Sequence, residues 1–361
     1  MKNKKDYPLV SIITPAFRAE YFIKDIIKNF SAFKYPNIEV VMVFDPSPDK
    51  GVEIARKMTK NKKNWRIIAN EDRLGISKCL NLAIEKSRGK YVVFFMTDMY
   101  VDPSCVSEQV KFIESADSTL GAVGAKTYDL HHRDLIQAYR MYFLPQTGYL
   151  YIPEYGLKDK KKYNQTFEGF SGIDGTLYKK SVLKKVGMFD LDIDSGINDL
   201  DLIWRTWLAG FRIVKIPSAK IFHWSLKEGR ATEKWEFSYA RMIDIFIQNY
   251  SLKYLIIYLP QLIAVYSARG LITLCQGNPN PLKGWLQSLY WSARYLPTGL
   301  KKRKIIQNEM RMVTDDYLYE KIFSPMSLWE FYKHLKWVQT HITPKILTKE
   351  GKNESILTFS K

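Results

Sequence analysis

The first hundred residues of this chain alternate short, continuously apolar segments with longer segments that are apolar on one side only. The continuous segments cover residues 9–14, 39–44, 65–69 and 91–96. Apolar side chains recur every three or four residues in the segments between them, at 22–30, 52–58 and 76–84. Buried strands that alternate with amphipathic helices are typical of a parallel sheet covered by helices on both faces. We therefore predict an α/β fold with a Rossmann-like, mostly parallel sheet.

Polar residues follow each predicted strand, and sheets of this kind bind ligands at the carboxyl ends of their strands. The polar segments are 14–18, 45–49, 70–75 and 97–102. Asp98 directly follows an apolar strand, so its carboxylate can hold a divalent cation whose other ligands are substrate phosphates. The alternative is that Asp98 caps a turn, which is a common role for Asp after a strand.

Other acidic residues and one histidine are further candidates, each with a purely structural alternative. Asp45 and Asp49 lie in a loop with two prolines, where they could contact a nucleotide or simply form Asx turns. Asp199 and Asp201 open a predicted helix, where the helix dipole alone favours carboxylates, although one could serve as a general base. His223 stands between aromatic residues and could equally be a packed core residue.

The chain is strongly basic, with 55 Lys and Arg against 37 Asp and Glu, a formal charge of +18. Such a surface attracts nucleic acid, anionic lipid or phosphorylated small molecules. The positive charge is scattered and no helix-turn-helix, zinc or RNA-binding signature accompanies it, so we do not expect a nucleic-acid partner. The three cysteines have no disulfide or zinc spacing, which favours reduced thiols in a cytoplasm.

Taken in chain order, these clusters resemble the family 2 glycosyltransferases, which have the GT-A fold. The matching segments are 12–17, 43–49, 70–81, 88–91, 96–98, 171–172, 186–190, 198–202, 209–213 and 217–223. The resemblance implies a nucleotide-diphosphate sugar as the donor. It assigns the donor nucleotide to Thr14, Pro15, Phe17, Asp45, Asn70, Gly75 and Thr97. It also implies that Asp98, with His223 as a further ligand, holds the Mn²⁺ or Mg²⁺ that bridges the two phosphates.

On the acceptor side, the resemblance implies that Asp199 is the base that deprotonates the acceptor hydroxyl. Asp201 and Gly172 would also line the acceptor side of the site. The sugar would transfer by direct displacement with inversion at the anomeric carbon. A positioned base is typically worth about 10²–10⁴-fold in rate.

The chain departs from the family pattern at three motifs. Met96 stands where the first Asp of the metal motif is expected, which weakens the expectation of a divalent cation. Phe44 and Pro46 replace an Asp and a Gly in the second motif, and Asn198 replaces the Glu before the base. The alternative function is therefore a catalytically degenerate protein on the same fold that binds a nucleotide or a glycan.

The C-terminal third is apolar and aromatic, and the segment 254–275 is about long enough to cross a bilayer. Pro260 and Arg269 interrupt this segment, which favours helices that lie in the membrane interface over a spanning helix. Helices packed on the catalytic domain are the alternative. Basic residues in this region could meet an anionic membrane surface. We expect a protein at the cytoplasmic face of the cell membrane, or a soluble cytoplasmic one, whose acceptor is a glycan linked to a polyprenyl phosphate or another glycan.

These patterns divide the chain into three parts. Residues 1–230 form the predicted GT-A domain, in which 129–167 is an irregular, loop-rich insertion. Residues 231–347 form a helical extension, and 348–361 form a polar, flexible tail.

Overall fold

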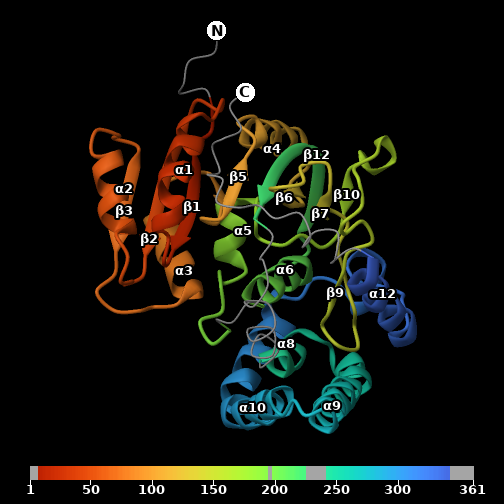
Figure 1. Cartoon of the computed structure of the whole chain (residues 1–361). Helices are drawn as coiled ribbons and strands as arrows, with labels where there is room; N and C mark the ends of the chain where they lie inside the picture. Colours follow the sequence, from red (N-terminus) through yellow and green to blue (C-terminus); the bar gives the residue numbers. More distant parts are fainter. Residues whose placement is uncertain (1–6, 194–196, 225–240, 342–361) are drawn as a thin grey trace.

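The computed structural model describes residues 7–193, 197–224 and 241–341. The N-terminal part is an α/β unit, and a group of helices from the C-terminal part lies at one end of it (Figure 1). The predicted α/β class and the C-terminal helical region are both confirmed.

Four parallel strands form one half of the central sheet in the order β4-β1-β2-β3. Their bounds are β1 Val10–Ala16, β2 Ile38–Phe44, β3 Trp65–Ala69 and β4 Tyr91–Phe94. Each lies within two residues of a predicted apolar segment. Continuous apolar composition suits β1, β2 and β4 because both faces of these strands are covered, whereas β3 at the sheet edge is only partly buried.

The other half of the sheet continues from β4 in the order β11-β6-β12-β10. Its strands are β6 Leu120–Asp129, β10 Phe167–Glu168, β11 Leu177–Lys179 and β12 Arg212–His223. β6 and β12 are parallel, whereas the short β11 between β4 and β6 runs antiparallel to both neighbours. Two more short strands, β5 Met99–Val101 and β7 Ile136–Ala138, pair with β12 and β6 at the edge where the site lies.

Helices cover both faces of the sheet and divide its core in two. One face carries α1 Glu20–Ser31, α2 Gly51–Thr59 and α4 Cys105–Ser115. The other carries α3 Ile76–Lys86, α5 Lys180–Lys185 and α6 Asn198–Leu208. In β2, Val40 and Met42 face the first core while Val41 and Val43 face the second, as expected for side chains that alternate along a strand.

The segment 129–167 has little regular structure but is attached to the sheet. It contains β7, β8 Tyr142–Phe143, β9 Leu150–Tyr151 and the 3-10 turn η2 Lys161–Tyr163. The buried ammonium of Lys126 binds Asp159 at 2.6 Å and the carbonyl of Tyr163 at 3.1 Å, which anchors this segment to β6.

The C-terminal helices, apart from α12, share the second core with α3, α5 and α6. They are α8 Met242–Asn249, α9 Leu252–Cys275, α10 Asn280–Ile305, η4 Ile306–Met310, α11 Asp315–Lys321 and α12 Leu328–His341. The predicted boundary at 230/231 and the predicted tail 348–361 lie outside the described residues, so the domain limits remain predictions.

Candidate active site

The carboxyl ends of β1, β2 and β4 bring the predicted donor residues to one edge of the sheet. Ala16 is in register with Phe44, and Ile13 is in register with Phe94. The segments that follow these strands therefore start side by side.

Asp45 is the centre of a hydrogen-bonded cluster that contains two other predicted donor residues. Its carboxylate accepts bonds from the Asn70 amide at 2.9 Å, the Gly75 backbone N–H at 2.8 Å, the Leu74 N–H at 3.1 Å and the Cys79 thiol at 3.1 Å. Burial raises the pKa of Asp45, but these bonds outweigh it and lower the pKa below its usual value. A carboxylate has about four acceptor sites. Asp45 therefore orders the loop in front of α3, and any contact with a nucleotide would have to share those sites.

Two other predicted donor residues lie in β1 and directly after it. The Thr14 hydroxyl is buried, and no hydrogen-bond partner for it lies among the described residues. Phe17 is 39% exposed, and the guanidinium groups of Arg73 and Arg18 lie 4.6 and 5.4 Å from its ring centre. The two arginines, which were not among the predicted site residues, add positive charge beside Phe17.

Asp98 and His223 meet although they are far apart in the sequence. The antiparallel pairing of β5 with the end of β12 aligns Met99 with His223, so the preceding Asp98 reaches the imidazole. The Asp98 Oδ2 lies 3.5 Å from the His223 Nε2. Burial raises the pKa of Asp98 and lowers that of His223, but their mutual attraction outweighs burial and reverses both shifts.

This pair fits one end of a divalent-cation site. The His223 Nδ1 lies 3.1 Å from the amide oxygen of Gln137, and its Nε2 is on the side of Asp98. In the described part of the chain, no group of three or more His, Cys, Asp or Glu could hold a metal. Two protein ligands suffice for Mg²⁺ or Mn²⁺ when phosphates complete the shell.

Asp199 lies in the first turn of α6, against the loop that contains Gly172. Its carboxylate accepts bonds from the backbone N–H of Leu200 at 2.8 Å and from that of Ile173. A Cβ on Gly172 would lie 3.6 Å from the Asp199 Oδ2, so the predicted catalytic and acceptor-side residues are neighbours. Burial raises the pKa of Asp199 to about 6, which outweighs the opposing backbone bonds.

Asp174 joins the two halves of the site, and the sequence analysis missed it. Asp174 forms an isolated β-bridge with Phe94 at the end of β4. The Gly175 N–H donates to the Phe94 carbonyl at 2.8 Å. Burial raises the pKa of Asp174 to about 7, the positive charge of His223 opposes this, and the charges of Asp199 and Asp98 raise it further. Asp174 therefore lies between the end of β4, which leads to Asp98, and Gly172, which is next to Asp199.

Lys215 is a second residue that the sequence analysis did not select. It is 2% exposed, on β12, and its ammonium lies 3.8 Å from the Met141 sulfur. Burial lowers its pKa to about 7, and the charge of Asp174 acts in the opposite direction. An isolated lysine in a strand gives no signal in the sequence, because its burial depends on residues distant in the chain.

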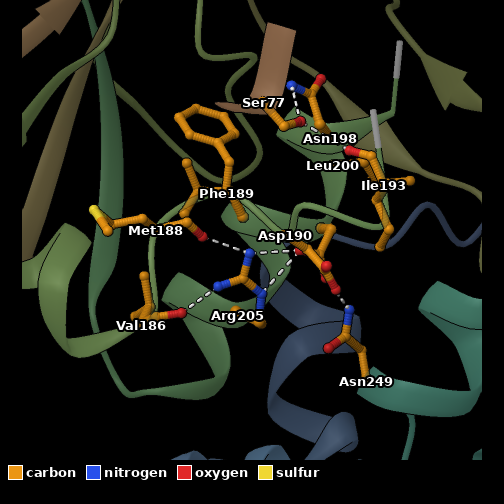
Figure 2. Close-up of polar contacts among 12 residues, drawn as sticks. Ser77, Val186, Met188, Phe189, Asp190, Ile193, Asn198, Leu200, Arg205 and Asn249 are labelled. Carbon is orange, nitrogen blue, oxygen red and sulfur yellow. Dashed lines mark hydrogen bonds and ion pairs between the residues drawn. The ribbon is translucent and has the colours of Figure 1, made fainter. Parts of the chain in front are cut away.

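Asp201, predicted on the acceptor side, is completely buried in α6. Its carboxylate accepts from the guanidinium of Arg205, at 2.9 Å from Nε, and from the Asn249 amide at 3.2 Å. Arg205 also donates to the carbonyls of Val186 and Met188 (Figure 2). Acceptor contact with Asp201 would require this buried ion pair to open.

Asn198, which replaces the expected Glu, is also a structural residue here. Its amide donates to the Ser77 hydroxyl at 3.2 Å, and that hydroxyl donates to the Ile193 carbonyl at 2.9 Å (Figure 2). These bonds attach the start of α6 to α3. They hold the helix turn that carries Asp199 against the donor half of the site.

The sequence model described as "Glycosyl transferase family 2" matches residues 11–187. The chain belongs to glycosyl transferase family 2. Within this family 2 chain, the matched segment contains Asp45, Asp98 and Asp174 but ends before Asp199 and His223.

Curated relatives align over limited parts of their length. The chain is 32% identical over 121 residues to "Uncharacterized glycosyltransferase EpsJ" of Bacillus subtilis, which covers 34% of each protein. It is 26% identical over 215 residues to "Poly-beta-1,6-N-acetyl-D-glucosamine synthase" of Staphylococcus aureus, which covers 58% of this chain and 48% of the relative. The chain thus spans between a third and a half of these relatives.

The solved structures of S. aureus TarS 1-349 have a similar fold. The complex with UDP-GlcNAc is 16% identical, with a TM-score of 0.52, and covers 87% of this chain and 93% of that chain. The complex with UDP is 17% identical, with a TM-score of 0.51, and covers 82% and 90%. This likeness supports the GT-A fold for the family 2 chain.

Proposed function

We propose that this chain is an inverting glycosyltransferase that moves a hexose or deoxyhexose from a nucleotide-diphosphate sugar to an acceptor hydroxyl. The observation that supports the proposal is the segment 172–174, which contacts Asp199 at Gly172 and pairs with Phe94, the strand end that leads to Asp98, at Asp174. In this proposal, a group for the leaving diphosphate and a group for the attacking hydroxyl share one site.

In this mechanism Asp199 accepts the proton of the acceptor hydroxyl as the oxygen attacks the anomeric carbon. The new C–O bond forms as the bond between that carbon and the diphosphate oxygen breaks on the opposite face. The nucleoside diphosphate then leaves with the bonding electron pair. A pKa of about 6 leaves most of Asp199 ionised at neutral pH while keeping it more basic than an ordinary Asp.

The donor half of the site would bind the nucleotide and its diphosphate. Thr14, Phe17 and the loop ordered by Asp45 would surround the nucleoside, and Arg73 would face the phosphates. Asp98 and His223 would hold a divalent cation, which supplies positive charge to the leaving diphosphate when it is bound. Pro15 and Thr97 remain proposed donor contacts at the same edge of the sheet.

A donor screen tests the proposal. The chain is incubated with Mn²⁺ and a panel of sugar nucleotides, and release of nucleoside diphosphate is measured. UDP-GlcNAc comes first because TarS was solved with it. Asp199→Asn should lower kcat by about 10²–10⁴-fold while donor affinity in calorimetry is unchanged. Asp134→Asn, at an exposed position outside the site, is the matched control.

Nucleotide binding without hydrolysis or transfer of any donor would instead support the degenerate, non-catalytic alternative. That alternative is motivated by Met96 and Phe44 at two motif positions. Full activity of Asp199→Asn would remove the proposed base.

For the acceptor we propose a glycan carried on a polyprenyl phosphate, or another cell-surface glycan precursor, which would place the enzyme at the cytoplasmic face of the membrane. The support is the resemblance to transferases with helical C-terminal extensions. Transfer of label from the donor into material that is extractable with organic solvent tests this proposal. Label found only in water-soluble glycans would favour the soluble alternative.

A further inference from the structure

Helices α9 and α10 pack against each other as a hairpin whose inward face contains many small and polar residues. In α10 the buried residues are Gly284, Trp285, Ser288, Ser292 and Gly299. In α9 they form one stripe at four-residue spacing, Tyr258, Leu262, Tyr266 and Gly270. A helix that faces water normally buries its largest apolar side chains and exposes its polar ones. In α10 the buried residues other than Trp285 are glycines and serines.

The outward face of the hairpin is apolar and aromatic. In α9 the exposed large side chains are Leu252, Ile256, Ile257, Ile263, Leu271, Ile272 and Leu274. In α10 they are Leu286, Tyr290, Trp291, Leu296, Leu300 and Ile305. Ile256, Leu271 and Tyr290 are each more than half exposed, at 66%, 56% and 61%. Apolar surface on this scale marks contact with another molecule or with a membrane.

The charge of the hairpin identifies the partner. Residues 252–305 contain no Asp or Glu and eight cations: Lys253, Arg269, Lys283, Arg294, Lys301, Lys302, Arg303 and Lys304. Lys302 and Arg303 form hydrogen bonds with residues outside the hairpin. Five of the other cations are exposed: Lys253, Lys283, Arg294, Lys301 and Lys304. Nucleic acid would match the charge but not the apolar face. An anionic lipid surface matches both, because aliphatic, aromatic and basic side chains together favour the bilayer interface.

Contacts along its length hold α9 on the protein. The Tyr258 hydroxyl is bonded to that of Tyr319 in α11 at 2.7 Å, and the Tyr266 hydroxyl donates to the Thr147 carbonyl at 3.1 Å. Arg269 donates to the hydroxyl of Tyr149. Among the described residues, α9 is the helix that is long and apolar enough to cross a membrane. One side of it is nevertheless attached to α11 and to the 129–167 segment, so lipid cannot surround it.

We infer that the α9–α10 hairpin docks flat on an anionic membrane, with its outward face in the lipid interface and with no crossing of the bilayer. Lys302 of α10 binds Asp190 and Asp192, 2.5 Å away, in the segment that leads toward α6. The hairpin therefore attaches next to the Asp199 side of the site. The inference does not depend on the proposed function, because docking can be measured without any sugar transfer.

Flotation of the full chain with lipid vesicles tests the docking. Vesicles that contain phosphatidylglycerol should carry the protein upward at low salt, and pure phosphatidylcholine vesicles should carry much less. Each exposed cation near the surface is worth roughly fivefold in partition, so removal of four should lower binding more than tenfold. The test variant combines Lys253→Gln, Lys283→Gln, Lys301→Gln and Lys304→Gln. The matched control combines Arg56→Gln, Lys57→Gln, Lys60→Gln and Lys63→Gln, on and just after α2, away from the hairpin (Figure 1).

A second variant tests the apolar face without changing the charge of the hairpin, by combining Ile256→Gln, Leu271→Gln and Tyr290→Gln. We expect it to stay at the bottom of the gradient with an unchanged melting temperature. Failure of the wild-type chain to float with anionic vesicles would overturn the inference. Flotation of both test variants at the level of the α2 control would overturn it as well.

Depth measurements separate a flat hairpin from a spanning helix. Cys275 is exposed while Cys79 and Cys105 are buried, so a polarity-sensitive fluorophore can be attached selectively at the end of α9. A second label position is provided by Ala264→Cys with Cys275→Ser, in the middle of the exposed face. A flat hairpin predicts that both labels are quenched mainly by quenchers in the lipid headgroups. Stronger quenching of the mid-helix label by quenchers at the bilayer centre would show a span and refute the flat arrangement.

Discussion

The raised pKa of Asp199 predicts an unusual pH dependence for transfer. An Asp with the ordinary pKa of 3.8 would be ionised throughout the range from pH 5 to pH 8, whereas burial raises the pKa of Asp199 to about 6. The difference corresponds to about 3 kcal/mol between its two protonation states. A general base must be ionised to act, so activity should fall as the pH falls through the folded-state pKa.

The magnitude follows from the ionised fraction. With a pKa of about 6, roughly nine tenths of Asp199 is ionised at pH 7 and roughly one tenth at pH 5. We therefore expect kcat/KM to fall about tenfold between pH 7 and pH 5, with the slope of a single proton. With an ordinary pKa, the change over this range would be less than about 10%.

The assay is release of nucleoside diphosphate at low donor concentration from pH 4.5 to pH 8. Saturating Mn²⁺ limits the contribution of His223, whose own pKa is raised by Asp98. Residual activity of Asp199→Asn should lose this dependence. A wild-type profile that is flat down to pH 5 would refute the reasoning, because it would mean that Asp199 is solvated or is not the base.

Three further outcomes test single side chains. Asp201→Asn breaks the buried ion pair with Arg205 and should lower the free energy of unfolding by about 3–5 kcal/mol in urea titrations, against no change for Asp134→Asn. Gly172→Val places methyl groups against the Asp199 Oδ2 and should lower kcat roughly 10²-fold with the melting temperature unchanged. His223→Gln should raise the Mn²⁺ concentration for half-maximal activity by about tenfold or more, and an unchanged requirement would exclude it as a ligand.

The parallel half of the sheet was predictable because its signals are local. Continuous apolar runs and helical periodicity define β1 to β4 and the helices between them without any knowledge of long-range contacts. The position of β11 was not predictable. Its three residues, Leu177–Lys179, lie between β4 and β6 in an antiparallel direction, and only pairing with strands far away in the sequence fixes that arrangement.

The candidate site was predicted in part, for the same physical reason. Asp98 and Asp199 could be proposed from the sequence because each follows a strand or begins a helix, which are local features. The buried ion pair of Asp201 was not predicted, although Arg205 four residues later is a local signal for such a pair along a helix. Asp174 stands alone between Ile173 and Gly175, as a turn residue would, so only the folded chain shows that it pairs with Phe94 at the end of β4.

The environments of the four carboxylates divide the site into a permanently charged half and a titrating half. Hydrogen bonds to Asp45 and the imidazole beside Asp98 outweigh burial and lower their pKa values, so both stay ionised at neutral pH. Asp199 and Asp174 have no cation bonded to them in the described structure, and burial raises their pKa values to about 6 and about 7. Carboxylates whose pKa values differ in this way can take different roles in a reaction. The charged half suits a cation and a diphosphate, and the titrating half suits the transfer of a proton from an alcohol.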